Sequence, residues 1–538
     1  MARRIVIVGG VAGGMSAATR LRRLDEHAEI VVLERGEHVS FANCGLPYYV
    51  GGVIKERDAL LLQTPGSLGA RFALDVRVNS EATAIDTEAQ TVSVRGPEGD
   101  YQLPYDELIL APGASPFVPP VPGIERALTL RNVADVDAMM AAVSASPREA
   151  VILGAGFIGL EVAENLRHRG IGVTVVELAD QVLAPFDPEM AVLVQRRLEA
   201  EGVTVRLGVS ATEVTPDAVV LSDGSRIAAD LVVAAIGVRP DSALASLAGI
   251  KTNERGGIVV DSYQRTSAPH VYAVGDAAVK CDAVSGDEVL VPLAQTANRH
   301  GRLVADVICR GLGGAKPVLG TAVVGVFGLT AAATGWNEKR ARAAGRDVMV
   351  IHTHPFDHAG YYPGAEQMAL KLVVDRRTQQ ILGAQGVGGA GVDKRIDVIA
   401  TAMRAGLTAI DLADLELAYA PQFGSAKDPV NMLGFVAENV FTGISPTIQW
   451  HEVADAQAAG ATVIDVRTPG EFAAGAIPGS VNIPLDELRD RFGELPAGDL
   501  IVSCAVGVRG HSALRVLAGR GRSARNLDGG YRTWASMR

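Results

Sequence analysis

Residues 4–14 read RIVIVGGVAGG, a β-branched run followed by a glycine-rich turn. Residues 4–8 predict a buried strand, and residues 15–24 predict a helix after the turn. A second predicted strand ends at Glu34, about twenty positions past the glycines, where an acidic side chain binds an adenosine ribose. The helix N-terminus would hold a pyrophosphate. The candidate contacts in the turn are Gly9, Gly10, Ala12 and Gly14.

The turn departs from the pattern G-x-G-x-x-G, because Val11 stands where the second glycine is expected. Alone, it is explained equally well as an ordinary glycine-rich connection. A second, complete copy follows a predicted strand at residues 150–153 and precedes another strand that ends at Glu177. Its glycines are Gly154, Gly156 and Gly159. Two such units predict two dinucleotide sites, and hence an α/β fold.

Three further predicted strands are each broken by a glycine: residues 108–113, 232–237 and 271–276. Each alone is typical of plain core architecture. In this order they make residues 1 to about 440 resemble the two-dinucleotide-binding flavoprotein family that includes glutathione reductase and NADH oxidase. The resemblance implies FAD in the first unit and NAD(P)H in the second. It also implies that Asp276 contacts the ribityl-phosphate region of FAD.

Glu177 bears on the choice of nicotinamide cofactor. A carboxylate at this place favours a free ribose hydroxyl and repels a 2′-phosphate, so NADH is expected. NADPH stays open, since an arginine from elsewhere in the chain would override one carboxylate.

The composition of the 538 residues narrows the class of protein. The length predicts several domains, and a net charge of −11 gives no basic surface for nucleic acid or an anionic membrane. The apolar runs, such as residues 231–237, are far shorter than the ~20 residues of a spanning helix. Four dispersed cysteines build neither a disulfide scaffold nor a zinc site. We therefore expect a cytoplasmic protein.

Residues 40–49, SFANCGLPYY, contain a single cysteine, Cys44. Relatives with a redox disulfide carry two cysteines in this segment. A lone thiol can cycle only through a sulfenic acid or through a mixed disulfide with a small thiol. Cys44 is thus the predicted redox cysteine, whereas Cys281 and Cys309 are interpreted as inert.

The same segment resembles coenzyme A-disulfide reductases, in which the cysteine forms a mixed disulfide with coenzyme A. Peroxidases and oxidases that use the sulfenic route place a histidine in the first turn, where this chain has Ala12. Coenzyme A phosphates need cations, and Arg20 and Arg23 lie three apart on one helix face. A solvated basic face that includes Arg22 is the alternative. By resemblance, Ser16, Ser40 and Asn43 are polar contacts to coenzyme A.

After Gly325 the resemblance implies a dimerisation domain and therefore a homodimer. Tyr361 and Tyr419 lie in segments that resemble loops reaching the partner subunit's active cysteine, and we expect them to donate to a departing thiolate. Interface aromatics without a chemical role are the alternative. His352, His354 and His358 lack the carboxylate or cysteine ligands of a metal site, so no metal is predicted.

The segment 442–449 is a predicted linker, and a new α/β domain follows it. Residues 462–467, 477–484 and 527–530 resemble the rhodanese family, although Ala476 stands where a histidine is usual. The predicted chemistry lies at Cys504, in a loop between a strand and a helix N-terminus, where backbone N–H groups stabilise a bound persulfide. Arg509 adds positive charge. The six-residue span from Cys504 to Arg509 matches sulfur-carrying rhodaneses, whereas phosphatase relatives have longer loops.

The predicted domains are an FAD-binding domain (1–120 with 241–320), an NAD(P)H-binding domain (121–240), a dimerisation domain (321–441) and a rhodanese domain (450–538). The hypothesis is an NAD(P)H-dependent flavoprotein that reduces coenzyme A persulfide, polysulfide or coenzyme A disulfide, with Cys504 carrying sulfane sulfur. Fusion raises the effective concentration of one site at the other. Three alternatives stay open: reduction of coenzyme A disulfide for thiol balance only, an NADH oxidase or peroxidase, and a redox sensor whose rhodanese domain binds a partner.

Overall fold

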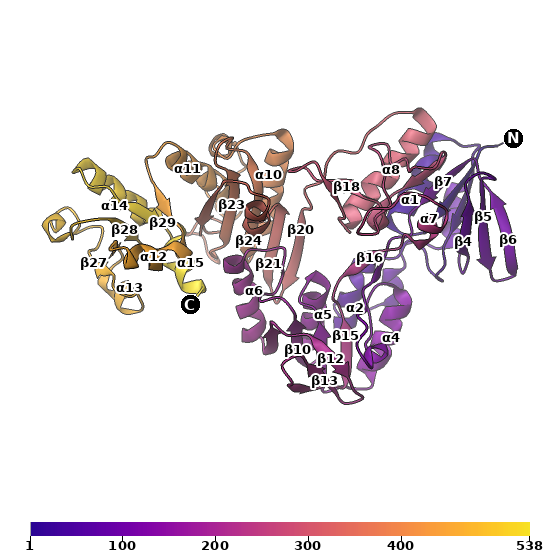
Figure 1. Cartoon of the computed structure of the whole chain (residues 1–538), viewed down its shortest axis with the longest axis horizontal. Coiled ribbons are helices and arrows are strands. Elements are labelled where there is room, and N and C mark those ends of the chain that lie inside the picture. Colours follow the sequence, from indigo (N-terminus) through magenta and orange to yellow (C-terminus); the bar gives the residue numbers. More distant parts are fainter. Residues whose placement is uncertain (1) are drawn as a thin grey trace. The chain divides into compact units, whose positions relative to one another are not determined.

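The computed structural model describes residues 2–538, which form two compact units (Figure 1). The first unit holds the residues up to Asp180 together with Gly202–Gly320. The second holds Gln181–Glu201 together with Thr321–Arg538. In the described part of the chain, no helix is both long and apolar enough to cross a membrane.

The first unit begins with a five-stranded parallel sheet of order β17-β7-β1-β2-β3. Its strands are β1 (Arg4–Val8), β2 (Glu29–Leu33), β3 (Asp75–Arg77), β7 (Glu107–Leu110) and β17 (Val271–Ala273). Alternate side chains of β1 enter two different cores, since successive residues of a strand point to opposite faces. Both faces are therefore covered, as in doubly wound folds.

Three helices cover one face of this sheet and an antiparallel meander covers the other. The helices are α1 (Ala12–Leu24), α3 (Pro65–Phe72) and α8 (Ala294–Arg310), of which α1 and α8 lie side by side (Figure 1). The meander consists of β4 (Glu81–Asp86), β5 (Thr91–Gly96) and β6 (Gly99–Pro104), and the short helix α7 (Ala243–Leu247) packs beside it.

A second parallel sheet in the same unit has the order β11-β10-β9-β15. Its strands are β9 (Glu149–Leu153), β10 (Gly172–Glu177), β11 (Val203–Leu207) and β15 (Leu231–Ala234). Helix α5 (Phe157–His168) packs on it, and a second meander covers part of it: β12 (Ala211–Val214), β13 (Ala218–Leu221) and β14 (Arg226–Ala228). Helix α4 (Val133–Ser144) precedes this sheet. Two nucleotide-binding folds in one chain confirm the predicted fold class for this unit.

Short elements complete the first unit. The segment with the candidate redox cysteine forms the 3-10 turn η1 (Asn43–Gly45), helix α2 (Leu46–Gly51) and the 3-10 turn η2 (Arg57–Leu60). Helix α2 packs closely on α5, because Gly51 leaves room for the side chain of Asn165. The remaining elements are β8 (Ala114–Pro116), η3 (Ile124–Arg126), β16 (Val238–Pro240), η4 (Gly275–Ala277), β18 (Lys280–Cys281) and β19 (Glu288–Val289).

The second unit contains an antiparallel sheet of order β20-β21-β24-β23-β22. The strands are β20 (Ala322–Val326), β21 (Leu329–Gly335), β22 (Val348–Thr353), β23 (Ala369–Asp375) and β24 (Ile381–Gly388). One face packs on α10 (Val392–Ala405) and α11 (Pro429–Phe441), with η5 (Asp411–Asp414) beside them. Short helix α9 (Glu338–Ala343) follows β21.

Residues 181–201 fall within the range predicted for the NAD(P)H-binding domain, yet they pack in the second unit. They contain helix α6 (Pro188–Ala200), which lies against β20, β21 and β24. Polar side chains of the sheet hold the start of α6: Lys371 bonds to Glu189, and Gln385 bonds to Asp187. The apolar residues next to Lys371 and Gln385 along their strands point to the other face of the sheet and enter the apolar core. No observation fixes the other predicted domain limits, which stay a prediction.

The C-terminal part of the second unit is a parallel sheet of order β25-β29-β28-β26-β27 with a core on each face. Its strands are β25 (Thr447–Ile448), β26 (Thr462–Asp465), β27 (Val481–Asn482), β28 (Leu500–Ser503) and β29 (Arg525–Leu527). Its helices are η6 (Trp450–Glu452), α12 (Val453–Ala458), α13 (Pro469–Ala473), η7 (Phe492–Glu494), α14 (Val508–Gly519) and α15 (Gly530–Ser536). Strand β25 lies inside the predicted linker, so the linker is shorter than expected.

Candidate functional site

The first glycine-rich turn has the geometry of a dinucleotide cradle. Gly9 has φ +103°, and a Cβ on it would lie 2.1 Å from the Ala111 carbonyl oxygen. A Cβ on Gly14 would lie 1.9 Å from the Gly9 carbonyl oxygen. Val11, the departure from the pattern, takes the N-cap position of helix α1 with φ −112°, so this position does not need the positive φ that favours glycine. The valine is therefore compatible with the turn.

The second turn repeats this arrangement. Gly154 has φ +105°, and Gly159 packs against its carbonyl oxygen. Gly156 occupies the cap position that Val11 holds in the first turn, and a Cβ there would meet no atom within 4 Å. Neither α1 nor α5 has a side-chain cap, so their first N–H groups are free to bind phosphate oxygens.

Glu34 and Glu177 end the second strand of each unit and are held in the same way. The Glu34 carboxylate accepts hydrogen bonds from the N–H of Gly10 and of Gly36, both at 2.8 Å. The Glu177 carboxylate accepts from the N–H of Ala155 at 2.8 Å and of Ala179 at 2.9 Å. Each carboxylate is thus fixed beside its glycine-rich turn, where an adenosine ribose would lie.

Asp276 lies in η4, at the end of the first parallel sheet, and pairs with Arg131 at 3.1 Å. Arg131 also donates to the Ala114 carbonyl, which fixes its guanidinium. Nearby, burial lowers the pKa of Lys280 to about 8, although the Asp276 carboxylate opposes this shift. Sequence reasoning missed Arg131 and Lys280, because neither belongs to a recognisable motif.

Cys44 lies in η1 with an exposed side chain, and its Sγ is 3.7 Å from the Asn43 amide oxygen. Partial burial of the thiol and the Glu161 carboxylate raise the pKa of Cys44, whereas Arg131 opposes the rise. The thiol is accessible to a substrate, and its thiolate needs a further positive charge or hydrogen-bond donor to form at neutral pH.

Glu161 and Tyr48 flank this cysteine, and their roles were not predicted. Tyr48 Oη donates to Glu161 Oε1 at 3.2 Å. Burial raises the pKa of Glu161, and burial together with Glu161 raises the pKa of Tyr48 to about 12. The pair joins α2 to α5, two helices that the sequence presents more than a hundred residues apart.

The predicted coenzyme A contacts lie along α1 and the cysteine segment. Arg20 pairs with Asp306 of α8 at 2.7 Å, and the exposed Arg23 lies over the Phe72 ring at 5.2 Å. Ser16 Oγ donates to Asn298 at 2.6 Å. Ser40 adopts φ +49° where the chain enters the cysteine segment. No observation tests these residues as coenzyme A ligands, so their role stays a prediction.

The alternative of a solvated basic face that includes Arg22 is wrong for Arg22. This side chain is buried, and its guanidinium donates to four backbone carbonyls. The acceptors are those of Asp25, Glu26, Phe72 and Ala73. Arg22 is a structural clamp between α1 and the end of α3, and it is not available to a ligand.

The structure brings Tyr361 and Tyr419 together in the second unit. Their hydroxyls are 2.8 Å apart and both rings are exposed. Their mutual hydrogen bond raises the pKa of Tyr361. The two phenol groups therefore lie side by side on one surface. Their role as donors to a departing thiolate and their approach to a cysteine of the partner subunit stay predictions.

The histidines of the 352–358 segment each bond to a different oxygen. His352 bonds to Asp528 and Glu189, His354 to the hydroxyl of Thr533, and His358 to Asp357. Their imidazole nitrogens therefore do not converge on one point.

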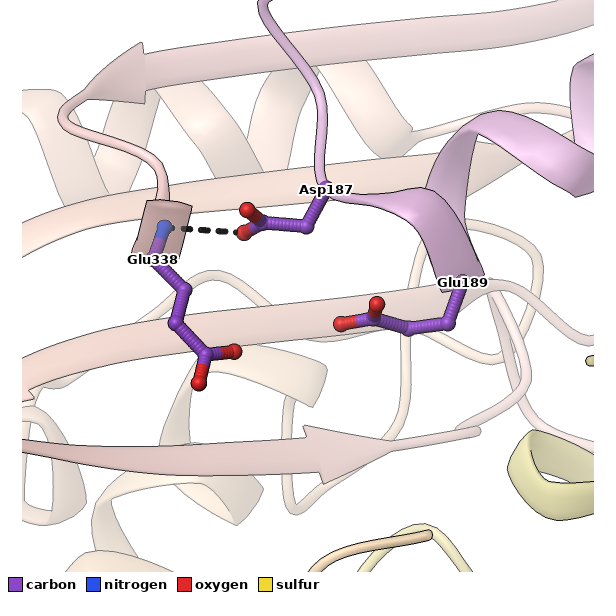
Figure 2. A group of neighbouring side chains, drawn as sticks. All are labelled: Asp187, Glu189 and Glu338. Carbon is purple, nitrogen blue, oxygen red and sulfur yellow. Dashed lines mark hydrogen bonds between the residues drawn. The ribbon is translucent and has the colours of Figure 1, made fainter. Parts of the chain in front are cut away.

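Asp187, Glu189 and Glu338 form an acidic cluster whose carboxylates lie within 4.8 Å of one another (Figure 2). Lys371 Nζ occupies its centre: it lies 3.0 Å from Asp187 Oδ2, 2.7 Å from Glu338 Oε2, and also contacts Glu189. The three carboxylates outweigh the effect of burial and raise the pKa of Lys371. The cluster thus holds an internal ammonium group, which provides the positive charge that a metal ion would otherwise supply.

Cys504 lies where β28 ends and α14 begins. Its Sγ accepts a hydrogen bond from the Gly507 N–H at 3.1 Å, and Gly507 has φ +94° at the helix cap. The side chain is 1% exposed, so the sulfur sits inside the loop. This is the predicted anion-holding loop. Arg509 forms a two-pronged ion pair with Glu471 at 2.6 and 2.8 Å, a partner that the motif does not reveal.

Models of known protein families match three consecutive segments of the chain. The profile of the pyridine nucleotide-disulphide oxidoreductase family matches residues 3–301, that of its dimerisation domain matches residues 321–429, and that of the rhodanese-like domain matches residues 449–537. A coenzyme A disulfide reductase of Staphylococcus haemolyticus is 34% identical over 454 residues, which cover 81% of this chain and 100% of that protein.

Two solved structures resemble the chain over nearly its whole length. One is the reduced CoADR-RHD of Bacillus anthracis, 48% identical with a TM-score of 0.98, covering 100% of this chain and 98% of that one. The other is a NAD-dependent persulfide reductase from A. fulgidus, 38% identical with a TM-score of 0.93, covering 99% and 100%.

Proposed function

Because the chain belongs to the pyridine nucleotide-disulphide oxidoreductase family and ends in a rhodanese-like domain, we propose that it reduces coenzyme A persulfide, polysulfide or coenzyme A disulfide with NAD(P)H. The observation that carries the proposal is a pair of contrasting thiols. Cys44 is exposed and has no second cysteine beside it, whereas Cys504 is enclosed by an anion-holding loop. One thiol suits exchange with a small disulfide, and the other suits transport of a sulfur atom.

The residues present fit FAD in the first unit. The contacts at Gly9 and Gly14 leave no room for a side chain at either position, and the uncapped start of α1 lies in the same turn. Glu34, Asp276 and Arg131 would bind the ribose and phosphate groups. FAD, when bound, relays two electrons between a nicotinamide and a disulfide.

The reduction of coenzyme A persulfide would proceed in two steps at Cys44. Its thiolate attacks the sulfur that is bonded to coenzyme A, the S–S bond of the persulfide breaks, and hydrosulfide leaves. The resulting Cys44–coenzyme A disulfide takes two electrons and a proton, which releases coenzyme A thiol and restores the Cys44 thiolate. The sum is NADH, a proton and coenzyme A persulfide giving NAD⁺, coenzyme A and hydrogen sulfide.

Two groups of residues support this chemistry. Partly buried Glu161, with a raised pKa, lies near enough to Cys44 to shift its pKa, and it is placed to hold a proton during the exchange. Tyr361 and Tyr419 would stabilise the departing thiolate in the site of the partner subunit, so the active enzyme would be a homodimer.

Four free cysteines fit a reducing cytoplasm, where we place the enzyme.

NADH-dependent sulfide release from coenzyme A persulfide, compared with coenzyme A disulfide reduction in one anaerobic preparation, tests the proposal. We expect faster turnover on the persulfide. Faster reduction of the disulfide with little sulfide would leave thiol balance as the function. Oxygen consumption without any thiol substrate would instead identify an oxidase.

Replacing Glu177 with glutamine is expected to shift the nicotinamide preference. The variant loses the charge that repels a 2′-phosphate but keeps an acceptor for the N–H of Ala155. The ratio of kcat/KM for NADPH to that for NADH should rise about tenfold, which corresponds to ~1.4 kcal/mol. Steady-state kinetics with both cofactors measure it, and the exposed Glu213→Gln in the same domain is the control. An unchanged ratio would show that Glu177 does not set the preference.

A further inference from the structure

His352 is the last residue but one of β22, in the dimerisation sheet (β20 to β24), and it bonds to the rhodanese-like domain. Its Nδ1 lies 2.6 Å from Asp528 Oδ2, and its backbone N–H donates to both Asp528 carboxylate oxygens at 3.0 and 3.1 Å. On the other side, its Nε2 lies 3.0 Å from Glu189 Oε1 at the start of α6. The side chain is 3% exposed. One buried imidazole therefore joins three segments of the second unit.

The surroundings favour the charged form of this imidazole. Burial lowers the pKa of His352, but Asp528 and Glu189 outweigh it and raise the pKa to about 9. Lys371 opposes the rise, and burial lowers the pKa of neighbouring His354 to about 3, so His354 stays neutral. The charged groups around His352 are Asp528 and Arg532 of the rhodanese-like domain, Glu189 and Asp187 beside α6, Glu338 of α9 and Lys371 of β23.

A continuous set of contacts leads from Asp528 to Cys504. A Cβ on Gly529 would lie 2.8 Å from His352 Cβ, and one on Gly530 would lie 2.5 Å from the Cys504 carbonyl oxygen. The N–H of Tyr531 donates to that carbonyl at 2.7 Å, and the N–H of Arg532 donates to the Ala505 carbonyl at 3.0 Å. Residues 528–532 are thus the direct support of the sulfur-holding loop.

We propose that His352 is a positioning residue for Cys504: its imidazolium fixes Asp528, and residues 529–532 transmit that position to the backbone of the loop. The inference rests on the proposed role of Cys504 as a sulfur carrier. It also makes the sheet that carries His352 part of the support of the sulfur-transfer site. Because the pKa of His352 is raised in the folded protein, the contribution of its imidazolium to the positioning of Asp528 is complete below about pH 6.5. This contribution is lost as the pH rises through about 9.

The test uses sulfur transfer from thiosulfate to cyanide by the full chain, which needs no NADH. Thiosulfate gives its sulfane sulfur to the Cys504 thiolate and leaves as sulfite, and cyanide removes that sulfur as thiocyanate. In His352→Gln, we expect kcat/KM to fall about tenfold to a hundredfold at pH 7, as a displaced reacting atom would cause. The fall should exceed any change in coenzyme A disulfide reduction in the same preparation.

The ratio of wild-type to His352→Gln rates, measured from pH 7 to pH 10, distinguishes positioning from general damage. It should approach one above about pH 9, because the wild type then loses its own imidazolium, and the titration of cyanide cancels in the ratio. His354→Gln is the matched control: it removes a neutral hydrogen bond to Thr533 from the residue that directly follows β22, so its ratio should not change with pH.

Asp528→Asn provides a second variant should His352→Gln fold poorly. Asparagine keeps the shape of the aspartate side chain, and this variant should lose as much sulfur-transfer activity as His352→Gln. The double variant His352→Gln with Asp528→Asn should lose no more activity than either single variant, since each substitution removes the same interaction. Unchanged transfer in both variants, or a loss that is constant from pH 7 to pH 10, would overturn the inference. Failure of the proposed function would appear separately, as sulfide release that does not depend on Cys504.

Discussion

Replacing Cys44 with serine is expected to abolish turnover of coenzyme A disulfide and of coenzyme A persulfide, with a loss of at least about 10³-fold in kcat, as for the removal of a covalent nucleophile. Serine fits the space of the exposed thiol in η1 but forms no disulfide. NADH should still reduce the bound FAD at its usual rate, since neither glycine-rich turn contains Cys44. Stopped-flow absorbance of the flavin, together with steady-state rates, measures both effects.

Cys281→Ser is the matched control, because Cys281 is also exposed and its thiol donates to the backbone carbonyls of Asp282 and Gly286. It should leave all rates within about twofold, as expected for a surface substitution. Turnover of coenzyme A disulfide that survived in Cys44→Ser would exclude the mixed disulfide. Oxygen consumption that survived in this variant would show that any oxidase reaction proceeds without the thiol.

Replacing Cys504 with serine should separate the two reactions of the chain. Sulfide release from polysulfide should fall about tenfold to a hundredfold, because the sulfur then reaches the reductase site only by diffusion and the high effective concentration of a tethered carrier is lost. Reduction of coenzyme A disulfide should not change. Sulfide release with each donor and disulfide reduction, measured in one preparation, check this.

A serine at position 504 keeps an acceptor for the Gly507 N–H, so the loop should retain its shape. Thermal unfolding of the variant provides the control for this point. Sulfide release equal to that of the wild type from every donor would show that the rhodanese-like domain does not take part in the reduction.

Local features of the fold were predictable because a few adjacent residues determine them. The positive φ of Gly9 and of Gly154 is a property of single positions in a turn, and the pattern of glycines reports it directly. The loop of Cys504 is equally local, since its strand, its glycine cap and its helix follow one another in sequence. These features located both glycine-rich turns and both candidate cysteines.

Features that depend on distant partners were not predictable. From its spacing along the helix, Arg22 was expected to lie on a basic, solvated face. The structure instead shows it buried and bonded to the carbonyls of Phe72 and Ala73, about fifty residues away in the sequence. The Tyr48–Glu161 bond likewise joins residues 113 positions apart. Helical periodicity describes one helix at a time, whereas these contacts depend on which helix lies beside it.

The segment 181–201 shows the same limit at the level of a domain. It directly follows a nucleotide-binding strand, and nothing in its composition separates it from that domain. It packs in the second unit through α6, where Asp187 and Glu189 meet Lys371, whose charge is visible in the sequence but whose burial is not.

The distance along the chain between His352 and Asp528 also imposes an order on biosynthesis. Asp528 leaves the ribosome 176 residues after His352, which takes roughly 10 to 35 s at the usual rates of translation. Until then the imidazole has only Glu189 as a carboxylate partner, although the sheet against which α6 packs is complete at Gly388. The nascent second unit can therefore complete its buried charge network only after β29 has been made.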